Sequence, residues 1–169
     1  EDDTGKPDKA LSALDKLATR DEVVGIVGPY TSACANAVAQ RMPDYELPLL
    51  VPAAAKGQIT KPGNDWAFRL NAPDTYSASS LVDAALSLGK PRTMAILYEN
   101  TDFGTSVGKA AKEIAAAKGL QVVFEEAYSP GSPDYRSTLT KVKAARPDLV
   151  FMVSYVADAV LLVRQSREM

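Results

Sequence analysis

The sequence predicts an α/β fold in which parallel strands are covered by helices on both faces, a three-layer sandwich. Short apolar runs without clean alternation recur along the chain, and most are followed by a stretch whose apolar residues have helical spacing. Glycine or proline marks many of the boundaries between them. This pattern is typical of parallel sheets, whose strands are buried on both sides because the connecting helices pack there.

The first half of the chain alternates between the two kinds of element. Leu11, Leu14 and Leu17 form a helical stripe, and the next apolar run ends at Gly28-Pro29. A turn-rich segment at residues 61–65 precedes the third apolar run. The predicted elements are a helix over 8–20, a strand over 23–27, a helix over 32–42, and strands over 47–51 and 66–70.

The second half continues the alternation. Asp74 is expected to cap a helix that ends at Gly89, and Ser132-Pro133 is expected to open a later one, since proline is favoured at the first helical position. The predicted elements are helices over 75–88, 104–118, 133–145 and 157–168, and strands over 93–98, 121–125 and 149–154.

Composition excludes several classes of function. The chain has 169 residues, no histidine, a single cysteine (Cys34) and a formal charge of −2. It therefore has no internal disulfide framework, and a structural zinc site or a Ser-His or Cys-His nucleophile pair is not expected. The balanced charge gives no general attraction to nucleic acid. We expect no metal, no cofactor and no catalysis.

Candidate binding residues follow the strands, because ligands of open α/β sheets bind at the carboxyl ends of the strands. The first such loop is Tyr30-Thr31-Ser32, where two hydroxyls meet a helix N-terminus that favours a carboxylate; Thr31 or Ser32 could equally be a simple helix cap. The second loop contains Ala53, Ala54 and Ala55, whose small side chains would let a ligand approach the backbone or simply pack against a helix.

The second half contributes acidic and aromatic residues at the same kind of position. Glu99 and Asp102 could form a metal or acid–base site, but we interpret them as solvated loop carboxylates, with Asp102 capping a helix. Tyr155 follows the last strand and is placed either to face a cleft or to pack.

Six segments in order along the chain carry a resemblance to a known family: residues 2–10, 27–32 (Val27-Gly28-Pro29-Tyr30-Thr31-Ser32), 51–55, 68–74, 97–104 and 155–168. Together they resemble the type-I periplasmic substrate-binding proteins of the branched-chain amino-acid (Leu/Ile/Val) binding family of ABC transporters. No single motif is specific, and the resemblance depends on their ordered sum over the whole chain.

The resemblance implies a two-lobed receptor that closes on a solute by hinge motion. Residues 1–72 would be part of the N-terminal lobe and residues 73–169 part of the C-terminal lobe, both incomplete. The chain would cover about half of such a receptor, beginning after its first strand and helix. Ser32 would bind the ligand's carboxylate, Ala53 would offer a backbone contact, and Phe103 and Tyr155 would cover the ligand.

Two departures from the family pattern widen the range of ligands. Ala55 lacks the hydroxyl that is usual there, and Phe103 replaces the more usual tyrosine. The ligand could be an amino acid, another carboxylate, an aromatic acid or an amide. The implied partner is a membrane permease, and the implied location is the periplasm or cell exterior, reached by a signal peptide not present in this chain. A ligand-sensing ectodomain of the same fold is the main alternative; an enzyme or a sugar-responsive regulator is weaker.

Overall fold

A computed structural model of the chain describes residues 1–61 and 63–169. These residues form two compact units, Glu1–Asp74 and Thr75–Met169, each with its own parallel sheet. Pro62, within the turn predicted at residues 61–65, lies outside the described residues.

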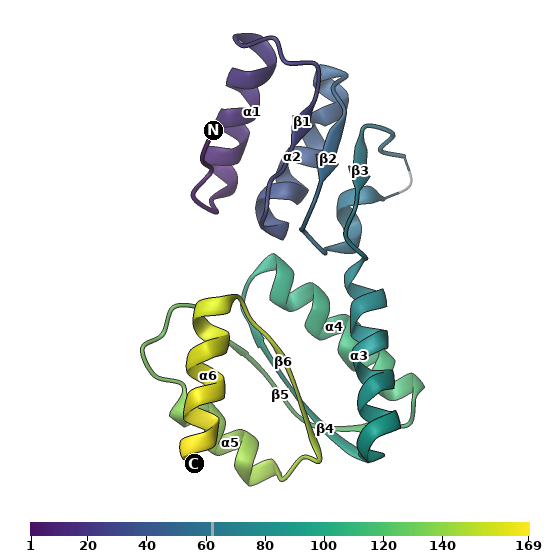
Figure 1. Cartoon of the computed structure of the whole chain (residues 1–169), viewed down its shortest axis with the longest axis vertical. Coiled ribbons are helices and arrows are strands. Elements are labelled where there is room, and N and C mark those ends of the chain that lie inside the picture. Colours follow the sequence, from purple (N-terminus) through teal and green to yellow (C-terminus); the bar gives the residue numbers. More distant parts are fainter. Residues whose placement is uncertain (62) are drawn as a thin grey trace. The chain divides into compact units, whose positions relative to one another are not determined.

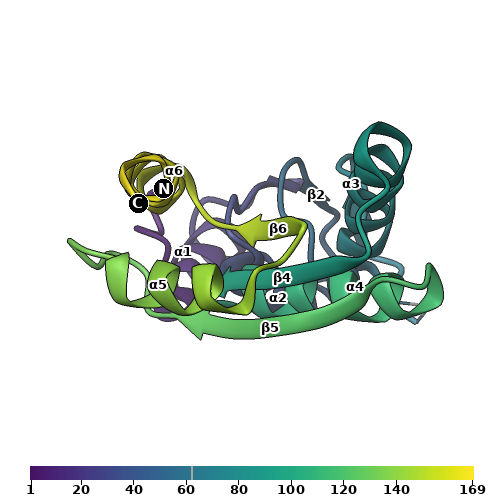
Figure 2. The same ribbon diagram turned by 90° about the horizontal axis from the view of Figure 1, so that it is seen from below.

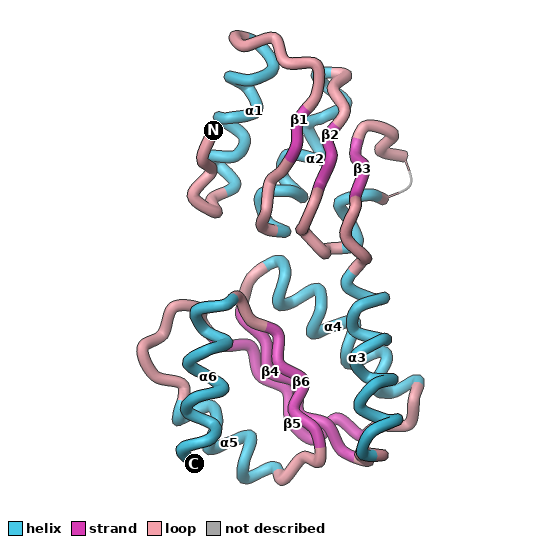
Figure 3. Tube along the Cα trace, in the orientation of Figure 1, coloured by secondary structure: helices cyan, strands magenta, loops and turns pink. Residues whose placement is uncertain are grey.

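The first unit is a three-stranded parallel sheet in the order β1-β2-β3, packed against two helices (Figures 1 and 3). Its elements are α1 (Pro7–Thr19), β1 (Ile26–Val27), α2 (Ser32–Tyr45), β2 (Leu49–Val51), the 3-10 turn η1 (Gly57–Thr60) and β3 (Ala67–Arg69). The helices and strands predicted here are present. The first strand is shorter than predicted, because the Val23 amide donates to the carbonyl of Leu17 at the end of α1 instead of joining the sheet.

Both long helices of the first unit pack on one face of its sheet. Leu14, Val38 and Leu49 belong to a single buried cluster on that face. Successive residues of a strand point to opposite faces, so Val27 and Phe68 lie on the other face, where they are 74% and 54% exposed. The sandwich is therefore two-layered in the described residues of this unit.

The second unit has all three layers. Its sheet order is β5-β4-β6, with β4 between its two neighbours (Figure 2). Helices α3 and α4 lie on one side of this sheet and α5 and α6 on the other (Figure 1). The elements are α3 (Asp74–Gly89), β4 (Thr93–Glu99), α4 (Asp102–Ala117), β5 (Gln121–Tyr128), α5 (Arg136–Ala145), β6 (Leu149–Val153) and α6 (Val156–Glu168).

The central position of β4 in its sheet explains why its sequence is a nearly unbroken apolar run. Its side chains alternate between the two faces, and both faces are covered. Met94 and Ile96 are fully buried in the cluster with α3 and α4, while Leu97 is fully buried in the cluster with α5 and α6. Burial on both sides removes the selection for polar residues that an exposed face would impose.

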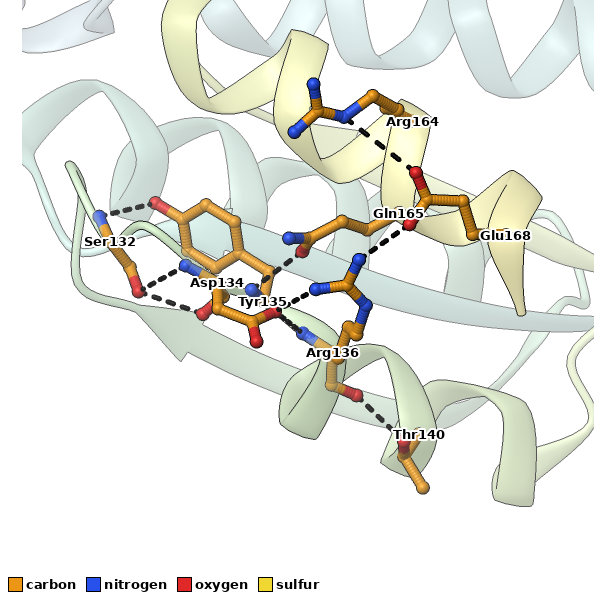
Figure 4. Close-up of polar contacts among 8 residues, drawn as sticks. All are labelled: Ser132, Asp134, Tyr135, Arg136, Thr140, Arg164, Gln165 and Glu168. Carbon is orange, nitrogen blue, oxygen red and sulfur yellow. Dashed lines mark hydrogen bonds and ion pairs between the residues drawn. The ribbon is translucent and has the colours of Figure 1, made fainter.

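The prediction that Ser132-Pro133 opens a helix is wrong, because α5 begins at Arg136. The Ser132 hydroxyl bonds within its own turn, accepting from the Asp134 amide at 3.3 Å. The amide of Tyr135, which precedes the helix, donates to Oε1 of Gln165 on α6 at 2.8 Å (Figure 4). The start of α5 is thus determined by a tertiary contact and not by the local Ser-Pro signal.

Candidate functional site

The loop after β1 leads directly into the N-terminus of α2. Gly28 has a φ of +125°, a conformation that favours glycine. The Thr31 hydroxyl caps α2 by accepting from the amide of Cys34 at 3.4 Å, so of the two candidate caps Thr31 has that position and Ser32 is the first helical residue. Tyr30 is 64% exposed at the tip of this loop.

Ser32 joins this helix start to the loop after β2. Its side chain is buried, and its hydroxyl oxygen accepts from the Lys56 amide at 3.4 Å. Ala54 and Ala55 are buried in the same loop, whereas Ala53 is half-buried. The strand-end loops of β1 and β2 therefore meet, as the carboxyl ends of adjacent parallel strands must.

Two residues that follow the same logic were missed as site residues by sequence reasoning. The Asn71 amide group donates to the carbonyl of Ala53 at 2.6 Å, and the Arg69 guanidinium donates to the carbonyls of Ala55 and Lys56 at 3.0 and 2.9 Å. Both lie at or just after the end of β3, so the rule that ligand sites form at carboxyl ends of strands could have identified them. Burial lowers the pKa of Arg69, and the charge of Asp74 acts against that shift.

The second unit brings together Phe103 and Tyr155. Their ring centroids lie 5.2 Å apart with an interplanar angle of 31°. Phe103 is in the first turn of α4, and Tyr155 occupies the N-cap position of α6. The two residues are 52 positions apart in the sequence, but both follow strands that are neighbours in the sheet, β4 and β6.

The segment that leads to Tyr155 is hydrogen-bonded to the end of β5. The Tyr128 hydroxyl lies 2.6 Å from Oγ of Ser154 and donates to the carbonyl of Val153 at 3.3 Å. Burial raises the pKa of Tyr128 to about 12, with a smaller contribution from the Glu99 charge, so the phenol remains protonated at ordinary pH. The end of β5 is thereby joined to the end of β6.

Glu99 and Asp102 do not have the roles that the sequence predicted for them. Glu99 was expected to be solvated, but it is fully buried at the end of β4. Asp102 was expected to cap α4, but the cap is Thr101, whose hydroxyl accepts from the Gly104 amide at 3.1 Å. An adjacent residue that can place its oxygen over the helix end takes the cap, while Asp102 lies in the first turn, where a negative charge is favourable.

The eight candidate residues thus form two groups, one at the carboxyl edge of each sheet. Within residues 1–61 and 63–169, no group of three or more His, Cys, Asp or Glu side chains is arranged to hold a metal ion. No helix in that part of the chain is long and apolar enough to cross a membrane.

Comparisons with known proteins identify the family of this chain. The family described as "Periplasmic binding protein" matches residues 1–169, and the chain belongs to this family. A Leu/Ile/Val-binding protein, BraC3, of Rhizobium johnstonii is 27% identical over 168 residues, covering 99% of this chain and 46% of the relative. A Leu/Ile/Val-binding protein homolog of Brucella abortus is 31% identical, covering 95% of this chain and 42% of the relative.

Solved structures give the same fold. The branched-chain amino-acid binding protein LivJ of Streptococcus pneumoniae, in complex with isoleucine, has a TM-score of 0.90 at 24% identity, covering all of this chain and 48% of LivJ. A solute-binding protein of Rhodopseudomonas palustris, in complex with 3,4-dihydroxybenzoic acid, has a TM-score of 0.88 at 25% identity, covering 99% of this chain and 46% of its own. The chain therefore spans just under half the length of the relatives it matches.

Proposed function

We propose that this chain is part of the solute-binding receptor of an ABC importer, which captures an amino acid or a related small carboxylate. The observation that carries the proposal is the placement of the candidate residues at the carboxyl edges of two parallel sheets, where α/β proteins bind their ligands. The family match supports it, as do relatives named for leucine, isoleucine and valine.

In this proposal the first unit anchors the charged end of the ligand. The N-terminus of α2 presents backbone amides and the positive end of the helix dipole, which together favour a carboxylate. Thr31 and Ser32 add hydroxyls at that point, and the exposed Tyr30 stands beside them in sequence. The half-buried Ala53 contributes backbone groups from the neighbouring loop, which Asn71 and Arg69 hold in place.

The second unit covers the body of the ligand. Phe103 and Tyr155 form a paired aromatic surface that would exclude water from an apolar or aromatic group. This chemistry suits a small carboxylate with an aliphatic or aromatic body, a class that includes isoleucine and 3,4-dihydroxybenzoate, the ligands in the two solved structures above. The proposed role is binding without catalysis, because none of the candidate residues is a nucleophile paired to a base.

We further propose that the two compact units belong to two lobes, divided near residues 72 and 73, that close on the ligand by hinge motion. Closure requires the ligand to bind the closed form more tightly, since equal affinity for both forms shifts no population. The closed receptor would dock on a membrane permease. Its location would be the periplasm or the cell exterior.

The experiment is a thermal-unfolding screen of the full-length protein against amino acids, aromatic acids and their amides. A ligand that binds the native state raises the midpoint of unfolding by mass action. We expect carboxylates to raise it and the matching amides to leave it unchanged. No shift with any small solute would contradict the proposal.

Matched variants sharpen the test. Replacing Thr31, which caps α2 in the candidate site, with alanine should weaken binding of the active ligand about tenfold, the scale of a lost hydrogen bond to a charged group. Thr19→Ala removes an exposed hydroxyl from α1 of the same unit and should leave the affinity unchanged. Equal losses in both variants would indicate a general effect on the unit.

A further inference from the structure

Glu99 is the one fully buried carboxylate among the described residues, and it lies at the last position of β4. The start of α4 packs directly against it. A Cβ atom added at Gly104 would lie 2.0 Å from the Glu99 carbonyl oxygen and 2.7 Å from its Cγ. Helix α4 can approach this closely only because residue 104 is glycine. The Glu99 side chain is therefore enclosed at the point where the aromatic pair is assembled.

Its two oxygens bind to two different loops. Oε1 accepts from the hydroxyl of Thr101 at 2.8 Å, and Oε2 accepts from the backbone amide of Tyr155 at 2.9 Å. Thr101 in turn caps α4 by accepting from the Gly104 amide. One carboxylate thus fixes both the start of the helix that carries Phe103 and the backbone of Tyr155.

This arrangement distinguishes Glu99 from residues that contact the ligand directly. Its side chain has no exposed surface, and each oxygen already accepts a hydrogen bond from within the unit. A buried carboxylate is costly unless it is hydrogen-bonded, and here one bond is to Thr101, two positions away, and the other is to Tyr155, 56 positions away. We propose that Glu99 is a positioning residue for ligand binding, which holds Phe103 and Tyr155 in the arrangement that covers the ligand. The proposal rests on the proposed function.

The geometry predicts that the hydrogen bonds of residue 99 matter for positioning and that its negative charge does not. A glutamine at position 99 can accept from the Tyr155 amide through its oxygen and donate to Oγ1 of Thr101 through its nitrogen, since that hydroxyl has a second lone pair. Both hydrogen bonds, to Thr101 and to Tyr155, are then kept without the negative charge. Leucine fills a similar volume but makes neither hydrogen bond. Positioning therefore predicts that Glu99→Gln resembles the wild type and Glu99→Leu does not.

The test uses the full-length protein with L-isoleucine and 3,4-dihydroxybenzoate as probes in titration calorimetry. We expect Glu99→Gln to bind within about threefold of the wild type and Glu99→Leu to lose about tenfold or more, the scale of about one or two hydrogen bonds. Asp148→Leu is the matched control, because Asp148 also bridges β4 and β6, but at the opposite, amino ends of these strands. It should lower the unfolding midpoint and leave the dissociation constant unchanged.

Two results would overturn the proposal. Wild-type affinity in a folded Glu99→Leu protein would show that the hydrogen bonds of Glu99 do not affect binding. Loss of binding in Glu99→Gln equal to that in Glu99→Leu would mean that the charge itself acts on the ligand.

If the wild type binds neither probe, the proposed binding of these two ligands fails. The positioning role of Glu99 is then tested by nuclear magnetic resonance. Hydrogen exchange at the Tyr155 amide and the contact between the Phe103 and Tyr155 rings should be preserved in Glu99→Gln and lost in Glu99→Leu. Preservation of both in Glu99→Leu would also overturn the positioning role.

Discussion

Thr93 and Asp148 hydrogen-bond to each other in both directions at the amino ends of β4 and β6. The Asp148 carboxylate accepts from the amide of Thr93 at 2.9 Å and from its hydroxyl at 3.0 Å, while the Thr93 hydroxyl oxygen accepts from the Asp148 amide at 2.9 Å. Oδ2 of Asp148 also accepts from the Arg92 amide at 2.9 Å. This pair closes the edge of the sheet opposite the candidate site.

The pair predicts how stability depends on acid pH. The backbone amides of Arg92 and Thr93 hold the pKa of Asp148 below its ordinary value of about 3.9. A carboxyl whose pKa is depressed in the folded state stabilises the protein above its unfolded pKa, and this contribution is lost as pH falls through the folded pKa. The free-energy difference between the wild type and Asp148→Asn should therefore be largest above about pH 4 and shrink below it. Denaturant unfolding at several pH values measures this, and a constant difference would contradict it.

Tyr128 predicts the opposite limb of the pH profile. Burial raises its pKa to about 12, against an ordinary value of about 10. Between these values the unfolded chain loses the phenolic proton while the folded protein keeps it, so stability should fall as pH rises above about 10. The difference in ultraviolet absorbance between wild type and Tyr128→Phe should show one phenol ionising near pH 12. Ionisation near pH 10 would indicate that the ring is not buried.

A methyl group at Gly104 should be poorly tolerated. It would collide with the carbonyl of Glu99, and backbone cannot move aside as a flexible side chain can. We expect Gly104→Ala to destabilise the protein by about 1–3 kcal/mol or more, as overpacking does. Gly89→Ala is the control, since a Cβ atom there has nothing within 4 Å and α3 would gain a better helix former. Thermal unfolding compares the two, and equal effects would contradict the close approach.

Gln165 is predicted to determine the start of α5. It is 2% exposed, and its Oε1 accepts from the Tyr135 amide (Figure 4). Gln165→Leu leaves that amide without its acceptor, which should cost about 1–3 kcal/mol and accelerate its hydrogen exchange. Arg136→Ala removes an exposed ion pair with Glu168 and should cost less than about 1 kcal/mol. A Tyr135 amide that remains protected in Gln165→Leu would contradict this role.

Much of the fold could be predicted because its signals are local. The leucine stripe of α1, the apolar run of β4 and the glycine after α4 each act on their immediate neighbours, so composition and spacing were sufficient. The order of elements follows from them, and parallel pairing follows from the alternation of helix and strand. The candidate residue Tyr155 could be found in the same way, because it follows a strand, whereas Phe103 was named from the family resemblance.

Two of the predictions that failed depended on distant partners, and one depended on a neighbouring residue. The start of α5 follows a bond from Tyr135 to Gln165, and the cap of α4 belongs to Thr101 and not to Asp102. Glu99 was interpreted as solvated because carboxylates in a loop are usually exposed, yet it accepts from an amide 56 residues later.

The sequence by itself determined which segments of this chain are helices and strands and which loops lie at the carboxyl ends of strands, because hydrophobic spacing and glycine or proline breaks are local properties. Only the tertiary structure decided that β4 lies between β5 and β6, that Glu99 is buried, and that the Phe103 and Tyr155 rings lie 5.2 Å apart. These outcomes depend on which strands are neighbours, and burial and hydrogen-bond partners are defined only once the sheet has formed.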